Sequence, residues 1–567
     1  IGADSGKPIL EALAAAQKDG GKRLLPDLDG SHVPTVVQTS ADKGRLVLTA
    51  AGNTDTAFTV DSNNLPIQAG YYAGGVLGYC ERGSQLIIRN CRNAGNLSLY
   101  SRVDADDGVV LGNYVKSKEI SSTVPDGAAS VKLHFVGGIV GVNLENQIID
   151  HCSNTGNMSG CVGIGGIVGL NGGYIYNCAL SGNFGNAGLN YLGGIASINI
   201  RTSQETKNYT DKNKTYTAGT IEDCRTEQGR TVTGKDCVGG IVSWNLTDGL
   251  VKNCASAANV TAAGNCAGGM AGRNSGLIEL ADASSDTAER TVQGSRGEGV
   301  GGIVGVNEAG GQLCISGGQN SQVVAAGSGL TVTGQSSVGG IIGINEGSLG
   351  DESTYLVSQV KLVRASKGNA GGVVGTSRGN ITRAVNRSDD VRADEGPAGG
   401  ITAVNERAIT GCVNYGDVTS SAGYVGGIVA ENKGTIANSS VNDTNGGTVT
   451  LIGRGKDEMG AVCALNEGTI TGSKPVANVK LAGTASIFGG IAGRNKGIIA
   501  DTELTYMPEL SGSGSLTVGG AVGVNENKVN EITAKGLNFK GFTNSRYLGG
   551  ITGQNGLETD GDATAQA

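Results

Sequence analysis

The side chains that could bind a metal or act as nucleophiles are few and widely spaced. The chain has three histidines, His32, His134 and His151, and twelve cysteines in 567 residues. Neither the HExxH pattern of zinc proteases nor a paired Cys–His spacing occurs. The acidic residues within 104–107 do not complete an EF-hand loop, and no phosphate-binding P-loop follows a strand. We therefore expect no metal site and no cofactor.

One seven-residue phrase recurs fifteen times, and the structure that it forms must position any functional side chains. Its clearest copies read Gly-Gly-Ile-Val-Gly-Val-Asn, at residues 137–143 and 301–307. Successive copies are mostly 27 to 34 residues apart, with longer gaps of 63, 46 and 38 residues. A fixed period of this size is typical of stacked supersecondary units. Short strands between turns, without helical periodicity, predict an all-β, single-stranded parallel β-helix, right-handed and of about fifteen rungs.

The repeat also predicts the division of the chain. Residues 1–72 form an N-terminal cap with lead-in strands, and residues 1–22 read as a short helix that covers the first rung. Residues 73–557 form the β-helix. Residues 558–567 carry no pattern and are expected to be a disordered tail.

Asparagine ends thirteen of the fifteen phrases, and Cys80 and Ser377 are the exceptions. In a parallel stack each amide can donate to the next rung, so we expect a buried structural ladder rather than a ligand site. Its members are Asn143, Asn171, Asn199, Asn245, Asn274, Asn307, Asn345, Asn405, Asn432, Asn466, Asn495, Asn525 and Asn555.

The position after this asparagine carries charges whose sign alternates in the second half of the chain. Neighbouring rungs lie about 5 Å apart, so opposite charges would favour the correct register by about 0.2 to 1 kcal/mol per pair. This charge ladder comprises Glu308, Glu346, Arg378, Glu406, Lys433, Glu467, Lys496 and Glu526.

Five cysteines occupy the same turn of five consecutive repeats. They are Cys91, Cys152, Cys178, Cys224 and Cys254. Stacked residues are close enough for disulfides, but an in-register column points all Cβ atoms the same way, which is poor disulfide geometry. We expect buried, reduced thiols that pack as small hydrophobic side chains.

An enzymatic alternative rests on two carboxylates from adjacent rungs. Polysaccharide lyases and glycosidases built on β-helices need such pairs, and Glu308 and Glu346 are the adjacent same-sign pair of the charge ladder. Like charges so close would raise one pKa. The competing interpretation, a solvated pair of turn residues, is the one that we favour.

Composition excludes other classes. The net charge of −8 argues against nucleic-acid binding. The chain contains no run of 18 apolar residues, so the sequence predicts no membrane-spanning helix. Three polar stretches interrupt the repeat, at residues 101–129, 201–218 and 281–297. We expect them to loop out of their rungs, and residues 201–218 to contribute to any ligand binding while adding little stability.

The phrase, followed by Gly-x-Ile and by Asn-Cys or Gly-Asn-Val-like turns, resembles the GLUG-motif repeats of bacterial surface proteins. Residues 165–178 and 426–438 carry it most clearly, and the resemblance covers roughly residues 70–556. It implies an extracellular or cell-surface location in bacteria, in adhesins or in the non-catalytic regions of IgA-cleaving surface peptidases. It transfers no catalytic residue to this chain.

We therefore predict a non-catalytic surface adhesin or stalk, one segment of a larger surface protein, that binds a host surface protein or a glycan. Two alternatives stay open. One is a carbohydrate-active β-helix enzyme, either a polysaccharide lyase or a glycosidase. The other is a structural, non-catalytic segment of a large surface peptidase.

Overall fold

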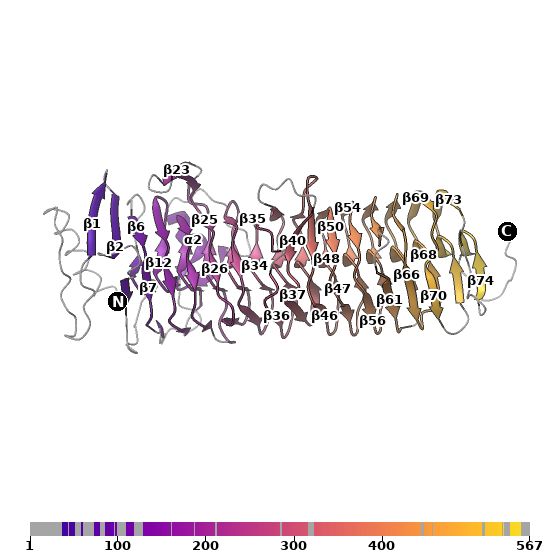
Figure 1. Cartoon of the computed structure of the whole chain (residues 1–567), viewed down its shortest axis with the longest axis horizontal. Helices are drawn as coiled ribbons and strands as arrows, with labels where there is room; N and C mark the ends of the chain where they lie inside the picture. Colours follow the sequence, from indigo (N-terminus) through magenta and orange to yellow (C-terminus); the bar gives the residue numbers. More distant parts are fainter. Residues whose placement is uncertain are drawn as a thin grey trace. The chain divides into compact units, whose positions relative to one another are not determined.

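The chain is a parallel β-helix, or β-solenoid, with almost no α-helix in the computed structural model (Figure 1). The structure describes residues 37–42, 45–50, 58–60, 73–79, 86–95, 97–98, 109–117, 129–159, 162–185, 187–203, 205–209, 213–283, 286–315, 322–443, 447–455, 458–512, 516–535, 537 and 545–556. The helix expected within residues 1–22 and the tail expected at 558–567 lie outside these residues.

The chain divides into two compact units. Unit 1 comprises residues 1–334 and 346–348, and unit 2 comprises residues 335–345 and 349–567.

Each complete rung of unit 1 passes through five short sheets, which we name C, D, A, B and E in chain order. Sheet C contains β4 (Ala73–Gly74), β11 (Val136–Gly137), β16 (Ile164–Gly165), β21 (Leu192–Gly193), β28 (Val238–Gly239), β33 (Ala267–Gly268) and β37 (Glu298–Gly301). Sheet D contains β5 (Leu77–Tyr79), β12 (Val140–Asn143), β17 (Val168–Asn171), β22 (Ala196–Asn199), β29 (Val242–Asn245), β34 (Ala271–Asn274) and β38 (Val304–Asn307).

The other three sheets complete the rung. Sheet A contains β2 (Arg45–Ala50), β6 (Leu86–Arg89), β13 (Gln147–Asp150), β18 (Tyr174–Tyr176), β25 (Thr220–Glu222), β30 (Leu250–Lys252), β35 (Leu277–Leu280) and β39 (Gln312–Ile315), and β1 (Val37–Asp42) joins it antiparallel to β2. Sheet B contains β3 (Phe58–Val60), β7 (Cys91–Asn93), β14 (Ser153–Asn154), β19 (Ala179–Leu180), β26 (Arg225–Thr226) and β31 (Ala255–Ser256). Sheet E contains β8 (Leu97–Ser98), β15 (Met158–Ser159), β20 (Phe184–Gly185), β27 (Thr231–Gly234), β32 (Asn259–Ala262), β36 (Arg290–Gly294) and β41 (Leu330–Gly334).

Unit 2 repeats this plan. The first phrase strands of unit 2 are β42 (Ser336–Gly339) and β43 (Ile342–Asn345), and the last are β74 (Ser545–Gly549) and β75 (Thr552–Asn555). Its remaining parallel stacks run from β49 (Asn380–Thr382) to β73 (Lys528–Ala534), from β45 (Tyr355–Ser358) to β65 (Lys474–Pro475), and from β46 (Leu362–Ala365) to β70 (Glu509–Gly512).

The Gly-Gly step of the phrase leaves no room for a side chain. A Cβ on Gly165 would lie 1.7 Å from the carbonyl oxygen of Val168, and one on Gly166 would lie 2.0 Å from the carbonyl oxygen of Gly194 in the next rung. Both contacts are with backbone, which cannot move aside. The glycine pair therefore permits the sharp bend between sheets C and D at close rung spacing.

A second bend, between sheets A and B, uses a left-handed residue in every rung that carries it. Asn90, His151, Asn177, Asp223 and Asn253 have φ between 50° and 55°. Asn, Asp and His are the non-glycine residues that most readily adopt this conformation. We name this column of five residues the corner ridge. The residue that follows each member is one of the five predicted cysteines.

Two insertions of unit 1 fold back as covers over the outer faces of two sheets. Helix α2 (Leu111–Ser117), from the longest gap between phrases, places Leu111 in a buried cluster with Phe135 and sheet D residues that include Val142 and Leu170. Within residues 201–218, β23 (Thr206–Tyr209) and β24 (Lys214–Thr217) pair as an antiparallel hairpin outside sheet A (Figure 1). This second segment is therefore an ordered cover and not the loose loop that its composition predicts.

Candidate functional site

The hairpin is anchored to the outer face of sheet A by tyrosines. Tyr209 of β23 and Tyr216 of β24 are buried against Ile87, Ile148 and Tyr174 of sheet A. In each strand of sheet A these residues are next to a residue that faces the core, so their own side chains point outward. The rings of Tyr174 and Tyr216 stack with centroids 4.5 Å apart and planes within 5°. The hairpin thus shields these apolar side chains on the outer face from solvent. We call the hairpin and these anchoring residues, together with Asp150, the hairpin clamp.

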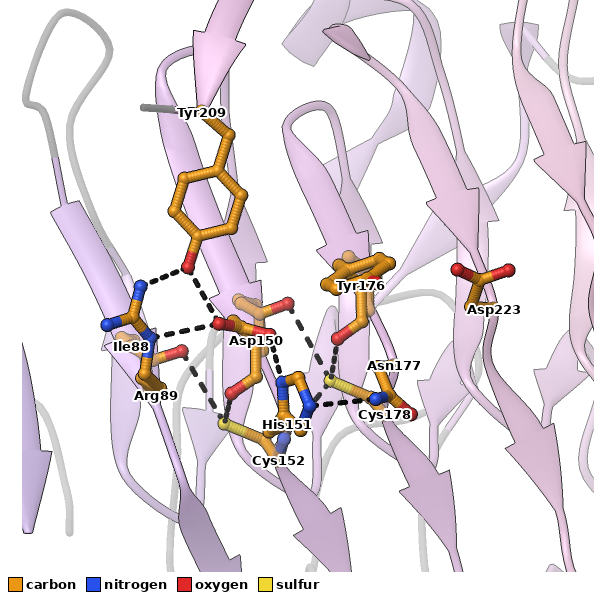
Figure 2. Close-up of polar contacts among 12 residues, drawn as sticks. Ile88, Arg89, Asp150, His151, Cys152, Tyr176, Asn177, Cys178, Tyr209 and Asp223 are labelled. Carbon is orange, nitrogen blue, oxygen red and sulfur yellow. Dashed lines mark hydrogen bonds and ion pairs between the residues drawn. The ribbon is translucent and has the colours of Figure 1, made fainter. Parts of the chain in front are cut away.

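Asp150 is the polar centre of the hairpin clamp (Figure 2). Its side chain is fully buried, yet its carboxylate accepts a hydrogen bond from Arg89 Nε at 2.9 Å and another from the Tyr209 hydroxyl at 2.6 Å. His151 Nδ1 donates to the other carboxylate oxygen. Arg89 Nη2 also donates to the Tyr209 hydroxyl. A buried charge is tolerated only with such partners, because desolvation otherwise costs several kcal/mol.

A second ion pair fixes the other strand of the hairpin. The Tyr174 hydroxyl donates to Glu222, and Lys214 Nζ lies 3.2 Å from the same carboxylate and 3.5 Å from Asp223. The Lys214 ammonium also stands 4.1 Å from the centroid of the Tyr176 ring, a cation–π contact. Burial raises the pKa of the Tyr174 hydroxyl, and its bond to Glu222 acts in the same direction. Burial opposes but does not outweigh the effect of Glu222, which raises the pKa of Lys214.

His151 could suggest general acid–base chemistry, but both ring nitrogens are occupied. Because Nδ1 faces the Asp150 carboxylate, it carries the proton, and Nε2 lies 2.8 Å from Asn177 Nδ2 and accepts its hydrogen bond. Both contacts fix the orientation of the imidazole ring, and 38 % of the side chain is exposed. This arrangement positions a surface histidine rather than freeing a base.

The two carboxylates of this face do not form a glycosidase pair. Asp150 and Glu222 lie in the same register row with Tyr176 between them, so they are two rungs, or about 10 Å, apart. Inverting glycosidases separate their carboxyl groups by roughly this distance. However, Asp150 is buried and accepts three hydrogen bonds, and Glu222 is bonded to Tyr174 and Lys214. Neither carboxylate is placed to reach a substrate.

Glu308 does not behave as the solvated turn residue that the sequence suggests. Its carboxylate lies 2.7 Å from Arg273 Nη1 and 3.2 Å from Trp244 Nε1, and Ser275 donates to it as well. Its side chain is only 16 % exposed. Arg273 therefore neutralises Glu308, which removes the basis of the proposed acid pair with Glu346. Arg273 also stands over the Trp244 ring, 5.1 Å from its centroid.

A serine-nucleophile pattern occurs that the sequence analysis missed. Residues 375–379 read Gly-Thr-Ser-Arg-Gly, which has the G-x-S-x-G spacing of α/β-hydrolases. That motif requires a strand-to-helix turn, whereas Ser377 ends strand β48 (Val374–Ser377) of a solenoid rung. Its side chain is buried, and Oγ donates to the Gly379 carbonyl at 2.9 Å. Ser377 thus replaces an asparagine of the ladder and is not an activated nucleophile.

The predicted asparagines form a hydrogen-bonded ladder within each unit. In unit 1, each Nδ2 donates to the Oδ1 of the next rung at 2.7 to 2.9 Å, from Asn143 to Asn307. In unit 2, the same bonds run from Asn405 to Asn555 at 2.7 to 2.8 Å. Asn345 is the register partner of Ser377, and its Nδ2 donates to the Asn380 carbonyl. Asn555, in the last described rung, is exposed rather than buried.

The charge ladder is stacked through its backbone, but its side chains pair only in part. In unit 2, each N–H donates to the ladder carbonyl of the preceding rung, as Lys433 does to Asn405. Arg378 lies 3.7 Å from Glu406, and Lys496 lies 3.9 Å from Glu467, with all four side chains largely exposed. Glu526 pairs with Arg494 instead, and Lys433 makes no ion pair among the described side chains. Sign alternation therefore overestimates the pairing.

The five cysteines form a buried column beside the corner ridge. Cys152 Sγ lies 3.5 Å from the Ile88 carbonyl oxygen, and Cys178 Sγ lies 3.6 Å from the equivalent oxygen of Ile149 (Figure 2). The ten described cysteines are all free thiols. In unit 2, Cys412, Ser439 and Ser473 continue the same role, each donating to the carbonyl two residues before it. Burial raises the pKa of the Cys412 thiol to about 12.

The sequence analysis expected residues 201–218 to contribute to ligand binding, but it did not single out the anchoring residues of the hairpin clamp, although one signal pointed to them. Four tyrosines in and beside the clamp, Tyr174, Tyr176, Tyr209 and Tyr216, belong to a chain with only 4 % aromatic residues. The first two lie in the rung before the 46-residue gap and the others within it. Aromatic outer-face positions beside an insertion that itself carries aromatics indicate a cover.

Comparisons with protein-family models, with curated proteins and with solved structures find no match for this chain. Within the described residues, no three His, Cys, Asp or Glu side chains group as a metal site, and no helix is long and apolar enough to cross a membrane.

Proposed function

We propose that the chain is a rigid stalk or adhesin of the bacterial cell surface, which presents binding residues to a host surface protein or a glycan. The observation that carries this proposal is the hairpin clamp. An insertion rich in polar residues is fixed on a parallel sheet by two buried tyrosines and an ion-pair network. Binding residues held by a rigid scaffold lose less conformational entropy on association.

The exposed and partly exposed side chains around the clamp suit a polar or glycan ligand. His151, Asn177 and Asp223 stand on the corner ridge beside Tyr176 (Figure 2), and Lys214 contacts Asp223. Each has a defined orientation because a neighbour bonds it: Asn177 bonds His151, and Lys214 contacts Tyr176 and Asp223. Preorganised aromatic and polar groups are typical of sites that read hydroxyl-rich ligands. The resemblance to surface repeats supports the location.

The proposal is tested by ligand binding and by catalysis in the same preparation. A glycan array and adhesion to host epithelial cells are measured for the chain, for Lys214→Ala and for Asn177→Ala, with Lys480→Ala as a partly exposed control in unit 2. We expect binding that the two clamp variants reduce and the control does not. Release of reducing ends from a bound glycan would instead favour the carbohydrate-active enzyme. Absence of any binding would favour a purely structural segment of a larger surface protein.

A further inference from the structure

Beyond the corner ridge, the outer face of sheet B holds an open trough of about 550 Å³ that no part of the proposed site uses. Its lining residues are Arg92, Ser153, Thr155, Ala179, Ser181, Arg225, Glu227 and Arg230. Three guanidinium groups and one carboxylate in one depression are notable in a chain whose net charge is −8. The trough is therefore locally cationic on an acidic protein.

The register of sheet B explains the shape of the trough. Arg92, Ser153, Ala179 and Arg225 are consecutive partners in one outward row. Two small side chains thus separate two exposed arginines that are three rungs, or about 14 Å, apart. Thr155, Ser181 and Glu227 form the adjoining row, because their backbone N–H groups bond successive rungs. The result is a shallow floor of hydroxyl groups with a guanidinium at each end.

The arginines of the trough have unused hydrogen-bonding capacity. Arg92 Nε makes only a long contact of 3.4 Å to Thr155 Oγ1, and within the described residues none of the three arginines pairs with a carboxylate. The Nε of Arg230 is buried and has no hydrogen-bond partner there. Elsewhere on the outer surface, Arg364 of unit 2 is paired with Asp394 of the next rung at 2.7 Å. Unpaired guanidinium groups are the usual ligands of carboxylate and sulfate groups, which they bind through two parallel hydrogen bonds.

We propose that this trough binds an acidic polysaccharide, with Arg92 and Arg225 holding carboxylate or sulfate groups. The hydroxyls of Ser153, Thr155 and Ser181, together with Glu227, then bond the hydroxyl groups of the sugar rings. A nucleic acid fits less well, because none of the lining residues is an aromatic that could stack on bases. This assignment rests on the proposed function, whose ligand class it narrows.

The test is calorimetric titration of the purified chain with three octasaccharides: an oligogalacturonate, which carries carboxylates, a heparin-derived oligosaccharide, which adds sulfates, and neutral maltooctaose. We expect one or both acidic ligands to bind and the neutral one not to. Arg92→Gln and Arg225→Gln should each weaken acidic binding about tenfold. Arg296→Gln, which neutralises an exposed arginine elsewhere in unit 1, should leave it unchanged.

Ser181→Asp provides a second variant that keeps both arginines and adds a negative charge to the floor. It should weaken acidic binding as well, and added salt should weaken binding to the unmodified chain. The proposal is overturned if neither acidic octasaccharide binds, or if the trough variants bind as tightly as the original chain. Equal affinity for a single-stranded oligonucleotide of the same charge would also overturn it. The titration needs no cell surface. If the chain binds an acidic octasaccharide but does not adhere to cells, that result would contradict only the proposed function.

Discussion

Buried amides are the residues on which this solenoid depends most. Many ladder asparagines donate to the next rung and also to a carbonyl of their own turn, so both sides of the amide have a partner. Asn432, for example, donates to Asn466 Oδ1 at 2.8 Å and to the Gly434 carbonyl at 3.1 Å, and accepts from Asn405. A short polar side chain repeated at one offset thereby satisfies a buried turn in every rung.

Asn432→Ala should lower the free energy of unfolding by about 1 to 3 kcal/mol, because it leaves polar groups of Asn405 and Asn466 buried and unpaired. Urea denaturation followed by circular dichroism measures the change. Asn555→Ala is the matched control, since the same amide is exposed in the last described rung, and it should change stability by less than about 0.5 kcal/mol. Equal losses for the two variants would contradict the ladder as the cause.

Tyrosines in half-buried positions give the protein an alkaline limit. Burial raises the pKa of Tyr191 to about 12, and burial with a bond to Asp443 raises the pKa of Tyr415 to about 12. The folded hydroxyls keep their protons at a pH where the unfolded ones, whose ordinary pKa is 10.0, have lost them. The folded state then binds more protons, so stability is complete below about pH 10 and falls as pH rises towards 12.

Denaturation at several pH values between about 8 and 11.5 should therefore show a falling free energy of unfolding above about pH 10. Tyr191→Phe keeps the ring, which stacks on Trp244 with planes 11° apart, and removes one titrating hydroxyl. We expect this variant to lose part of the alkaline slope while matching the original chain near pH 8. An unchanged slope would mean that Tyr191 titrates normally in the fold.

At the scale of elements, an outer face that another segment covers carries apolar residues, and an uncovered outer face carries charged residues. The position after the ladder asparagine is apolar at Leu144, Ile200 and Leu246, which lie in the buried cluster that contains Leu111 of helix α2. The same position is charged in unit 2, as at Lys433 and Glu467, where the side chains meet solvent. Apolar residues at a normally charged offset could have predicted this cover. The hairpin was harder to predict, because Lys, Asn and Thr dominate its sequence and only two tyrosines anchor it.

Tyr209→Ala should destabilise unit 1 by about 3 to 5 kcal/mol, since it leaves a cavity over sheet A and removes a partner of the buried Asp150 carboxylate. This reverses the expectation that residues 201–218 add little stability. Lys207→Ala, on the same strand, breaks only an exposed ion pair with Glu205 and should cost less than about 0.5 kcal/mol. Thermal unfolding of both variants measures these losses. A negligible effect of Tyr209→Ala would support the expectation that residues 201–218 add little stability.

Ion pairs on the rungs differ in value according to burial. Arg494 bridges Glu458 at 2.6 Å and also bonds Glu526, and its side chain is 21 % exposed. Arg494→Gln should cost about 1 to 3 kcal/mol, because two partly buried carboxylates lose their counter-charge. Lys496→Gln, which breaks an exposed contact of 3.9 Å to Glu467, should cost less than about 0.5 kcal/mol.

Measuring these two variants at low and high salt separates the contribution of the exposed ion pair from that of the partly buried one. The Lys496 effect should vanish at high salt, whereas most of the Arg494 effect should remain. A larger loss for Lys496→Gln than for Arg494→Gln would support the alternating ladder that the sequence predicts instead of the Arg494 bridge.

At the scale of the whole molecule, the fold was predictable and the site was not, for the same physical reason. A solenoid rung contacts only its neighbours, so a repeated offset determines the stacking of Gly165, Asn171 and Cys178 without knowledge of the rest. The contact between Tyr209 and Asp150 joins residues 59 positions apart through an insertion whose own path has no repeat. Likewise, the sequence shows that Arg92 and Arg225 lie in one row, three rungs apart, only when the rung count across two gaps is known. Function therefore lies where the repeat is interrupted or where its variable positions align.

Nearest-neighbour stacking also predicts how stability is distributed within unit 2. Strand β75 pairs with β72 (Val522–Asn525) alone among the described residues, and Leu548 and Ile551 beside it are 49 % and 39 % exposed. Strands β63 (Cys463–Asn466) and β68 (Ala492–Asn495) have a partner on each side and buried apolar residues.

Hydrogen exchange measured by mass spectrometry should accordingly show a gradient. Amides of residues 545–556 should exchange first, those of β72 later, and those of β63 and β68 last, because opening an inner rung breaks two interfaces and opening the last one breaks a single interface. Asn495→Ala should steepen the loss of protection in β68 and β72 while leaving β63 less affected. Uniform protection across these strands would mean that unit 2 opens in one cooperative step, and the nearest-neighbour description would then fail.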